Sequence, residues 1–305
     1  MTRVHHMVRP RISVEGPWRV ESDFPTGFPP PPDDQMQGFL SITTDSPSMP
    51  TDRRLDAVRE DLKHMGSVAI CFSGGLDSTV LADIAFRELG DRAIAVMADV
   101  PMMTRRQRDL AGTISEHIGI GLVTIPLGYG DLPDILLNGR DRCYICKTAM
   151  YSAICGKAEE LRLGHVINGE ITDDLSEDRP GMRASGEYGI RRPFIDAGIG
   201  RDTIREYIGS MDLPVPLVKD TCMLMRYPVG TPVTGDDLTI TEELEEDVRD
   251  ATGIRQIRIR RKGDVFSVQT STAEQDTLLS CLDNIDIIFA RKGLRFTIDP
   301  EGYDK

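Results

Sequence analysis

The stretch VAICFSGGLDSTVLADIAFREL, residues 68–89, decides the fold. An apolar run at 68–72 predicts a buried strand, and apolar residues at helical spacing over 77–89 predict a helix. Between them, two glycines let the backbone turn without a Cβ clash and approach a ligand closely. The helix that follows presents unsatisfied N–H groups to that ligand, so the turn favours an anion.

Polar side chains surround the two glycines, Gly74 and Gly75. Ser73 and Ser78 add hydroxyl donors, and Asp77 can cap the helix or help to position a magnesium ion that phosphates hold. The spacing is not the Walker pattern, which needs more widely spaced glycines and a lysine. An ordinary strand-to-helix turn rarely contains all of these residues together, so we predict a phosphate-binding site.

Alternating helices and strands begin at residue 53. Helices are predicted over 53–65, 77–89, 103–118, 143–162 and 201–211, and strands over 68–72, 93–99, 120–125 and 165–169. Strands separated by helices predict an α/β fold with a doubly wound parallel sheet, in which ligands bind at the carboxyl ends of the strands.

A smaller α/β unit is predicted after the loop PVGTPVTGDD. Its elements are a helix over 240–252, strands over 254–260 and 264–270, a helix over 272–291 and a strand over 294–299. The first 50 residues are rich in proline and have no helical or strand period, which predicts a disordered extension. We therefore predict three parts: the extension at 1–50, a sheet domain at 51–235 and a small domain at 236–305.

The composition disfavours several classes of protein. The 305-residue chain has a formal net charge of −13, so it has no broad basic surface, and binding to nucleic acid is not expected. No apolar run approaches the roughly 20 residues that span a bilayer, and the N-terminus lacks the pattern of a signal peptide. These features predict a cytoplasmic protein without a membrane partner, whose six cysteines are reduced.

The cysteines indicate thiol chemistry or a metal site. Cys143 and Cys146 in RCYICK lie on one face of a helix start, where the helix dipole favours the thiolate. Two cysteines make half of a zinc site, and the chain has no second C-x-x-C motif to complete it. With Cys222 as a third member they could hold an iron–sulfur cluster. The alternative is that they are packing residues.

Two further stretches contain candidate ligands. Asp99 ends the second predicted strand, where its carboxylate can accept a hydrogen bond from a ribose or adenine group, or cap the next helix. The segment DDLSEDRPGMRA, which includes Arg183, follows a predicted strand end and predicts an active-site loop. A solvated charged loop is the alternative.

The motif SGGLDS resembles the pyrophosphate-binding loop of the PP-loop ATPases, which cleave ATP between the α and β phosphates. The order of motifs narrows the resemblance to the LarE family of ATP-dependent sulfur transferases, over about residues 53 to 303. The motifs that carry it are SGGLDS, RCYICK, NGEITDDLSEDRPGMRA, GIRRPF, CMLMRYPVGTPVT, IRIRRKGD and IDPEGYD.

The resemblance implies an activity and its cofactors. The enzyme would bind ATP and Mg²⁺, adenylate a carboxylate of a pyridinium biscarboxylate mononucleotide, a precursor of the nickel-pincer cofactor, and replace oxygen by sulfur. In one branch of the family the cysteine matching Cys222 gives up its own sulfur. In another, three cysteines hold a cluster, here a 4Fe–4S cluster on Cys143, Cys146 and Cys222, that carries a sulfide. Family members also form symmetric oligomers, which implies a homo-oligomer.

The substrate-binding residues that the resemblance implies are Arg258, Arg260, Glu246, Arg226 and Arg183. Arg258 and Arg260 alternate on one strand face, and their guanidinium groups suit a phosphate or a carboxylate. The chain departs from the family pattern at Ile171, Met225 and Val229, where Asn, Ser and Tyr are usual. These departures affect the expected acceptor more than the adenylation.

Other functions fit part of the pattern. A PP-loop tRNA thiolase would also use a C-x-x-C motif and a distant cysteine with a 4Fe–4S cluster, but this acidic chain has no recognisable RNA-binding module. An amide-forming adenylating ligase would keep the glycine turn without needing reactive cysteines. A non-catalytic nucleotide-binding module would need neither Asp77 nor Ser78, and turnover of ATP to AMP separates it from the enzymes.

Overall fold

The computed structural model describes residues 53–176, 180–215, 217 and 220–302. The extension predicted at 1–50 lies outside the described residues. Across the described ranges, no helix has the length and apolar character needed to span a membrane.

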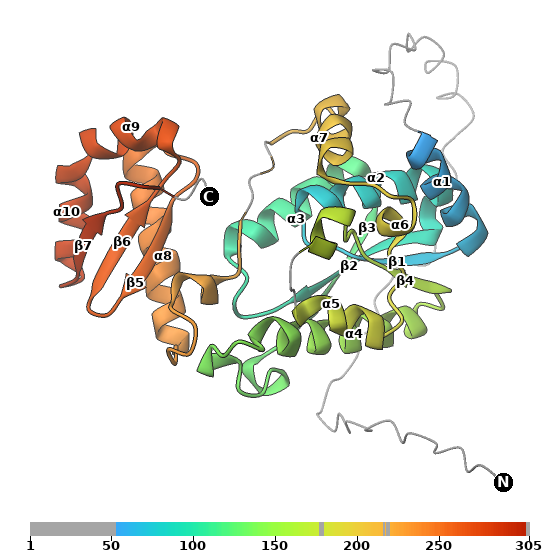
Figure 1. Cartoon of the computed structure of the whole chain (residues 1–305), viewed down its shortest axis with the longest axis horizontal. Helices are drawn as coiled ribbons and strands as arrows, with labels where there is room; N and C mark the ends of the chain where they lie inside the picture. The colour runs from blue at the N-terminus through green and yellow to red at the C-terminus, as the bar shows by residue number, and fades with distance from the viewer. Residues whose placement is uncertain (1–52, 177–179, 216, 218–219, 303–305) are drawn as a thin grey trace, which may run out of the picture. The chain divides into compact units, whose positions relative to one another are not determined.

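The described elements alternate between helices and strands along the chain (Figure 1). The strands are β1 (Val68–Cys71), β2 (Ala93–Asp99), β3 (Gly121–Pro126), β4 (His165–Ile167), β5 (Arg258–Lys262), β6 (Val265–Gln269) and β7 (Arg295–Ile298). The α-helices are α1 (Arg53–Met65), α2 (Leu76–Leu89), α3 (Arg105–Ile118), α4 (Arg142–Glu160), α5 (Pro180–Glu187), α6 (Pro193–Asp196), α7 (Arg201–Ser210), α8 (Gly235–Thr252), α9 (Gln275–Ser280) and α10 (Leu282–Arg291). The short 3₁₀ helices are η2 (Gly90–Arg92), η3 (Tyr129–Asp131), η4 (Ile135–Leu137), η5 (Thr172–Ser176), η6 (Met223–Arg226) and η7 (Thr272–Glu274).

The larger sheet is parallel throughout, with the strand order β3-β2-β1-β4. The chain builds outward from β1 through β2 to β3, and then returns to place β4 on the other side of β1. This reversal makes the sheet doubly wound and confirms the predicted fold class. In such sheets the ligand-binding crevice lies at the carboxyl ends of the strands where the winding reverses, here beside β1.

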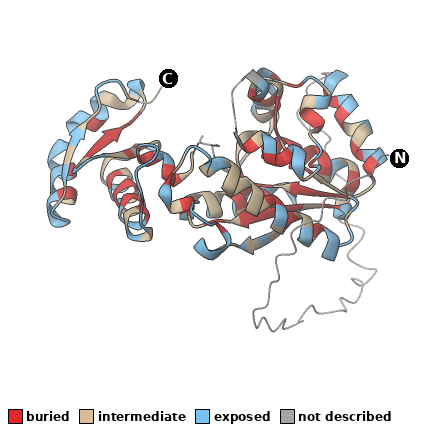
Figure 2. Cartoon of the chain, turned by 60° about the horizontal axis from the view of Figure 1, so that its bottom comes forward, coloured by how far each residue is buried: buried red, intermediate tan, exposed pale blue. Residues whose placement is uncertain are grey.

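Helices cover both faces of this sheet, and its central strands β1 and β2 are mostly buried, as the red parts of the strands in Figure 2 show. Val68 and Ile70 of β1 belong to the core that α1, α2, α3 and α7 complete. Ala69 points the other way, into a second core with Ile154 and Ala158 of α4. Because successive strand residues point to opposite faces, a strand covered on both sides is apolar without interruption, as the sequence of β1 is.

A second sheet has the order β5-β6-β7, with β5 antiparallel to β6 and β6 parallel to β7. Its apolar core is separate and includes Leu244 and Val248 of α8, Leu278 of α9 and Phe289 of α10. This matches the smaller α/β unit expected after the proline-rich loop. The domain boundary near residue 235 stays a prediction.

Three predicted elements differ from the structure. The helix predicted at 240–252 begins at Gly235, because the side chain of Thr234 accepts a hydrogen bond from the Asp237 N–H and Asp237 reciprocates in a capping box. The helix predicted at 272–291 is divided into η7, α9 and α10. The strand predicted at 254–260 begins only at Arg258. Helices α5 and α6 had not been predicted.

Candidate active site

The glycine turn, residues 73–78, follows β1 and folds back on itself. The hydroxyl of Ser78 donates to the Gly75 carbonyl oxygen at 3.1 Å and lies 3.2 Å from the Ser73 hydroxyl. Gly75 is the N-cap of α2, and no side chain caps this helix. The first N–H groups of a helix need acceptors, so an anion at this turn would satisfy them.

Two glycines fix the position of the turn between its neighbours. Gly74 has a φ of +69°, and a Cβ there would lie 2.9 Å from the Cα of Ala111 in α3. Gly169 follows β4, and a Cβ there would lie 2.9 Å from the carbonyl carbon of Asp77. The turn is therefore packed against α3 on one side and the end of β4 on the other, with no room for a larger residue.

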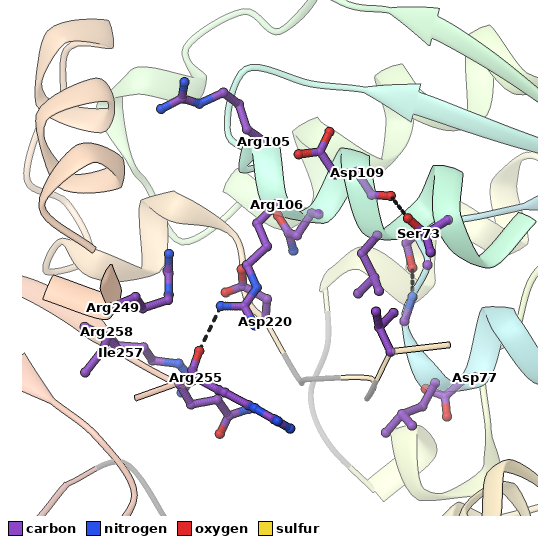
Figure 3. Close-up of a pocket in the computed structure, with 18 of the residues that line it drawn as sticks. Ser73, Asp77, Arg105, Arg106, Asp109, Asp220, Arg249, Arg255, Ile257 and Arg258 are labelled. Carbon is purple, nitrogen blue, oxygen red and sulfur yellow. Dashed lines mark hydrogen bonds between the residues drawn. The ribbon is translucent and has the colours of Figure 1, made fainter. Parts of the chain in front are cut away.

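A cavity of about 1060 Å³ opens at this turn (Figure 3). Its lining includes the first turns of α3 and α7, part of α8 and the residues that lead into β5. Arginines come from each of these segments, among them Arg106, Arg201, Arg249 and Arg258. Carboxylates alternate with them, so the cavity offers both anion-binding and cation-binding groups.

The cavity joins six of the predicted site residues: Ser73, Gly74, Gly75, Asp77, Glu246 and Arg258. Ser78 is buried beneath the turn. Asp174, which belongs to the segment predicted as an active-site loop, lines the same cavity. The roles predicted for these residues stay predictions, but the turn that follows β1 and the first residue of β5 do line one space.

Asp99 lies at the end of β2, as expected, and is already paired. Arg108 of α3 donates from Nε to its Oδ1 at 2.6 Å. The Asp99 side chain is one quarter exposed and does not line the cavity. Contact with a ribose or adenine group stays a prediction, and it would compete with this ion pair.

The three predicted thiols lie at the same sheet edge as the glycine turn. Helix α4 follows β3 after a loop that contains η3 and η4, and it leads back to the start of β4, so its first turn, with Cys143, is on the side of the carboxyl ends of the strands. Cys146 and Cys222 pack against one apolar cluster. The N–H of Met223 donates to the Met102 carbonyl at 3.1 Å, which ties the Cys222 segment to the loop after β2.

The three thiols differ in exposure. Cys143 is exposed, whereas Cys146 and Cys222 are partly covered. Burial, and then the neighbouring thiols of Cys222 and Cys143, raise the pKa of Cys146 to about 12. Burial also raises the pKa of Cys222, although Arg142 and Arg226 act in the opposite direction.

The structure gives no support for the predicted metal site. Among the residues that the structure describes, no group of three His, Cys, Asp or Glu side chains is placed to hold a metal ion. The predicted 4Fe–4S cluster is therefore not supported by these thiols as they stand, and no chemical step below runs through it.

We expect Cys143 to react first with iodoacetamide, about tenfold or more ahead of Cys146 and Cys222, because its thiol is exposed, whereas burial covers the other two thiols and raises the pKa of each. Peptide mass mapping over a time course measures this order. In the denatured chain the three thiols should react at similar rates. Equal rates in the folded protein would contradict the burial described here.

Arg226 is buried rather than exposed to a ligand, with a relative exposure of 1%. Its Nε donates to Glu245 at 2.8 Å, and its other nitrogens donate to Glu245, Asp220 and Thr221. All of its nitrogens thus have partners inside the protein. Direct substrate binding by Arg226 stays a prediction, while its contacts favour a structural role.

The remaining predicted ligands lie in different surroundings. Arg183 of α5 stacks on the ring of Tyr144, 3.7 Å from its centroid, and pairs with Glu187. Arg260 lies on the same face of β5 as Arg258 but does not line the cavity. Its buried Nε has no hydrogen-bond partner among the described residues.

Glu245 is the functional candidate that sequence reasoning missed. Predicted Glu246 is partly exposed and pairs with Arg249 at 2.6 Å, whereas Glu245 is fully buried. The signal was present in the helix period, because the buried positions of α8 include 241, 244, 245 and 248. That pattern places position 245, and not 246, on the inner face.

Comparison with known proteins supports one family. No family model matches the chain. An uncharacterized protein of Methanocaldococcus jannaschii is 31% identical over 182 residues, 60% of this chain and 69% of that protein. The pyridinium-3,5-bisthiocarboxylic acid mononucleotide synthase of Lactiplantibacillus plantarum is 27% identical over 245 residues, 79% of this chain and 88% of that enzyme.

A more distant similarity supports the wider superfamily. A chain of the glutamine-hydrolyzing GMP synthase of Methanosarcina acetivorans is 22% identical over 215 residues, 66% of this chain and 67% of that one. The parallel sheet, the glycine turn at the end of β1 and the cavity above it agree with both similarities. The chain is an enzyme of the ATP pyrophosphatase kind, and it belongs to the LarE family of the PP-loop superfamily.

Proposed function

We propose that this enzyme is an ATP-dependent sulfurtransferase that adenylates an acceptor carboxylate, releases pyrophosphate and replaces a carboxylate oxygen by sulfur. The observation that carries the proposal is the single cavity that joins the uncapped start of α2 to Arg258 and Glu246. A nucleotide and a second anionic molecule can meet there, beside the edge of the sheet where the thiols lie.

ATP is proposed to bind with its β and γ phosphates at the glycine turn. The N–H groups at the start of α2 would bind the phosphate oxygens, and the hydroxyl of Ser73 lies within the same turn. Asp77 lines the cavity beside it and is the residue that would help to hold Mg²⁺. Such an ion, when bound, neutralises charge on the phosphates.

The acceptor is proposed to be a pyridinium biscarboxylate mononucleotide. The name of the Lactiplantibacillus plantarum relative states a bisthiocarboxylic acid product, which is the same molecule with sulfur in place of oxygen. Its phosphate and carboxylates suit the arginines on the far wall, among them Arg258 and Arg255. This wall is the reason to expect an anionic acceptor.

In the first step, an oxygen of the acceptor carboxylate attacks the α-phosphorus of ATP. The bond from the α-phosphorus to the bridging oxygen breaks, and pyrophosphate leaves with the electron pair. Amides at the start of α2, which no side chain caps, would stabilise the leaving group. The product of this step is an acyl adenylate.

In the second step, the thiol of Cys222 gives up its proton as its sulfur attacks the carbonyl carbon, and AMP leaves, which gives a thioester. A base then takes the Cα proton of Cys222, the freed electron pair forms a Cα–Cβ double bond, and the Cβ–S bond breaks with its electrons on sulfur. The thiocarboxylate is released, and dehydroalanine remains at position 222. Iron and labile sulfide in anaerobically purified protein test the other source, a cluster-bound sulfide, and their presence would contradict this step.

The proposal is tested by the products that ATP gives. With Mg²⁺ and the pyridinium biscarboxylate mononucleotide, we expect AMP and pyrophosphate, and we expect little AMP when the acceptor is left out. A tRNA thiolase would need tRNA instead, and an amide-forming ligase would need ammonia to give product. Formation of ADP, or AMP without any dependence on the acceptor, would contradict the proposal.

A further inference from the structure

A network of buried ion pairs lies beside Cys222, with Glu245 at its centre. The Glu245 side chain is fully buried. Its Oε1 accepts from Arg226 Nε at 2.8 Å and from the Ile259 N–H at 2.9 Å. Its Oε2 accepts from Arg226 Nη2 at 3.1 Å and from Arg249 Nη2 at 3.2 Å. One carboxylate therefore joins η6, α8 and β5.

Arg226 extends this network of ion pairs toward the glycine turn, where ATP is proposed to bind. Its Nη1 donates to the carbonyl oxygen of Thr221 at 2.9 Å, and its Nη2 donates to Asp220 Oδ1 at 3.0 Å. Asp220 Oδ2 in turn accepts from the Thr104 hydroxyl at 3.4 Å. Thr104 is the N-cap of α3, the helix that packs on Gly74.

The network of ion pairs thus holds the segment that contains Cys222 on both sides of the thiol. Thr221 and Asp220 precede the thiol, and Arg226 follows it. On the far side, the Ile259 N–H lies next to Arg258, which lines the cavity. Glu245 therefore links the position of the thiol to the position of the arginine wall.

Stability alone is a weak explanation for these charges. Removing two charges from water is costly, and well-packed apolar residues are often as stable as a buried ion pair. A carboxylate paired with a guanidinium adds a fixed geometry, because the planar guanidinium group of arginine sets the orientation of both side chains. A site in which sulfur must meet a reactive acyl group needs such fixed geometry.

We infer that Glu245, acting through Arg226, is a positioning residue for sulfur transfer: it holds the Cys222 segment in reach of the acyl group. The inference rests on the proposed function and extends it. Glu245 touches no part of the cavity and acts only through its neighbours. Without this contact the acyl adenylate still forms at the glycine turn, but water hydrolyses it before the thiol of Cys222 attacks it.

The test is the amount of thiocarboxylate formed per AMP in a single turnover, measured with the pyridinium biscarboxylate mononucleotide. In Glu245→Gln, every neighbour of the carboxylate is a donor, so the amide nitrogen must face a donor in either orientation. We expect AMP formation to continue and the product per AMP to fall by about 100-fold. A purely structural role would lower both together.

Two further variants sharpen the test. Glu243→Gln is the matched control, because Glu243 is on the same helix and forms a partly exposed pair with Lys292 at 2.7 Å. It should keep the wild-type ratio. Glu245→Asp keeps the negative charge, so we expect this variant to fold even if Glu245→Gln does not. Its shorter side chain cannot reach Arg226 and Ile259 together, and the ratio should fall to an intermediate value.

The outcomes separate the two claims. An unchanged ratio in Glu245→Gln, or AMP and product that fall in parallel in Glu245→Gln and Glu245→Asp, would overturn the inference. A wild-type protein that forms no AMP from this acceptor would refute the proposed function, and the inference with it. A lower ratio with AMP formation maintained supports both.

Discussion

Replacing Gly74 with alanine is expected to lower AMP formation by about 100-fold or more, because the amides of the turn would no longer hold the leaving pyrophosphate. At φ +69° an alanine is strained, and its Cβ would lie 2.9 Å from the Ala111 backbone. The clash is with backbone atoms of α3, which cannot turn aside as the end of a flexible side chain could. The measurement is the rate of AMP release at saturating ATP.

Gly112→Ala is the matched control for this prediction. Gly112 follows Ala111 in α3, and a Cβ there has nothing within 4 Å. Alanine inside a helix is more stable than glycine by roughly 0.5–1 kcal/mol, so this variant should fold and cleave ATP normally. If Gly74→Ala cleaved ATP as fast as Gly112→Ala, the turn would not be the pyrophosphate site.

Replacing Cys222 with alanine is expected to abolish the thiocarboxylate product while AMP still forms. The thiol is the proposed nucleophile, and the glycine turn that makes the adenylate lies on a different segment. In the wild-type protein, a turnover should also remove the elements of hydrogen sulfide from residue 222. Mass spectrometry of the peptide that contains it measures this loss.

Cys281→Ala serves as the control for the cysteine prediction, because Cys281 packs beside the core of the second sheet. It should form product at the wild-type rate. Product from Cys222→Ala, or an intact Cys222 peptide after turnover, would show that sulfur comes from elsewhere. The proposed second step would then be wrong, although the first could stand.

Local patterns made much of the fold predictable. The strand β1 is apolar throughout because both of its faces are covered, and α1 has a regular apolar period. Both were predicted close to their observed bounds. The break at Cys281 between α9 and α10 could not be predicted, because no proline or glycine marks it.

The site could be predicted only where one segment contains the whole signal. The glycine turn is such a segment, and its residues do line the cavity. The role of Arg226 depends on Glu245, which lies on another element and is brought to it by packing. The predicted Glu246 lines the cavity, and its role stays a prediction, whereas the apolar pattern of α8 would have placed Glu245 on the buried face of the helix.

The central claim is that the acceptor carboxylate attacks the α-phosphorus of ATP at the glycine turn. The most direct test is to label both carboxylate groups of the acceptor with a heavy oxygen isotope and to analyse AMP by mass spectrometry after one turnover. The account predicts one labelled oxygen on the AMP phosphate for each sulfur inserted. Unlabelled AMP, with sulfur present in the product, would contradict it.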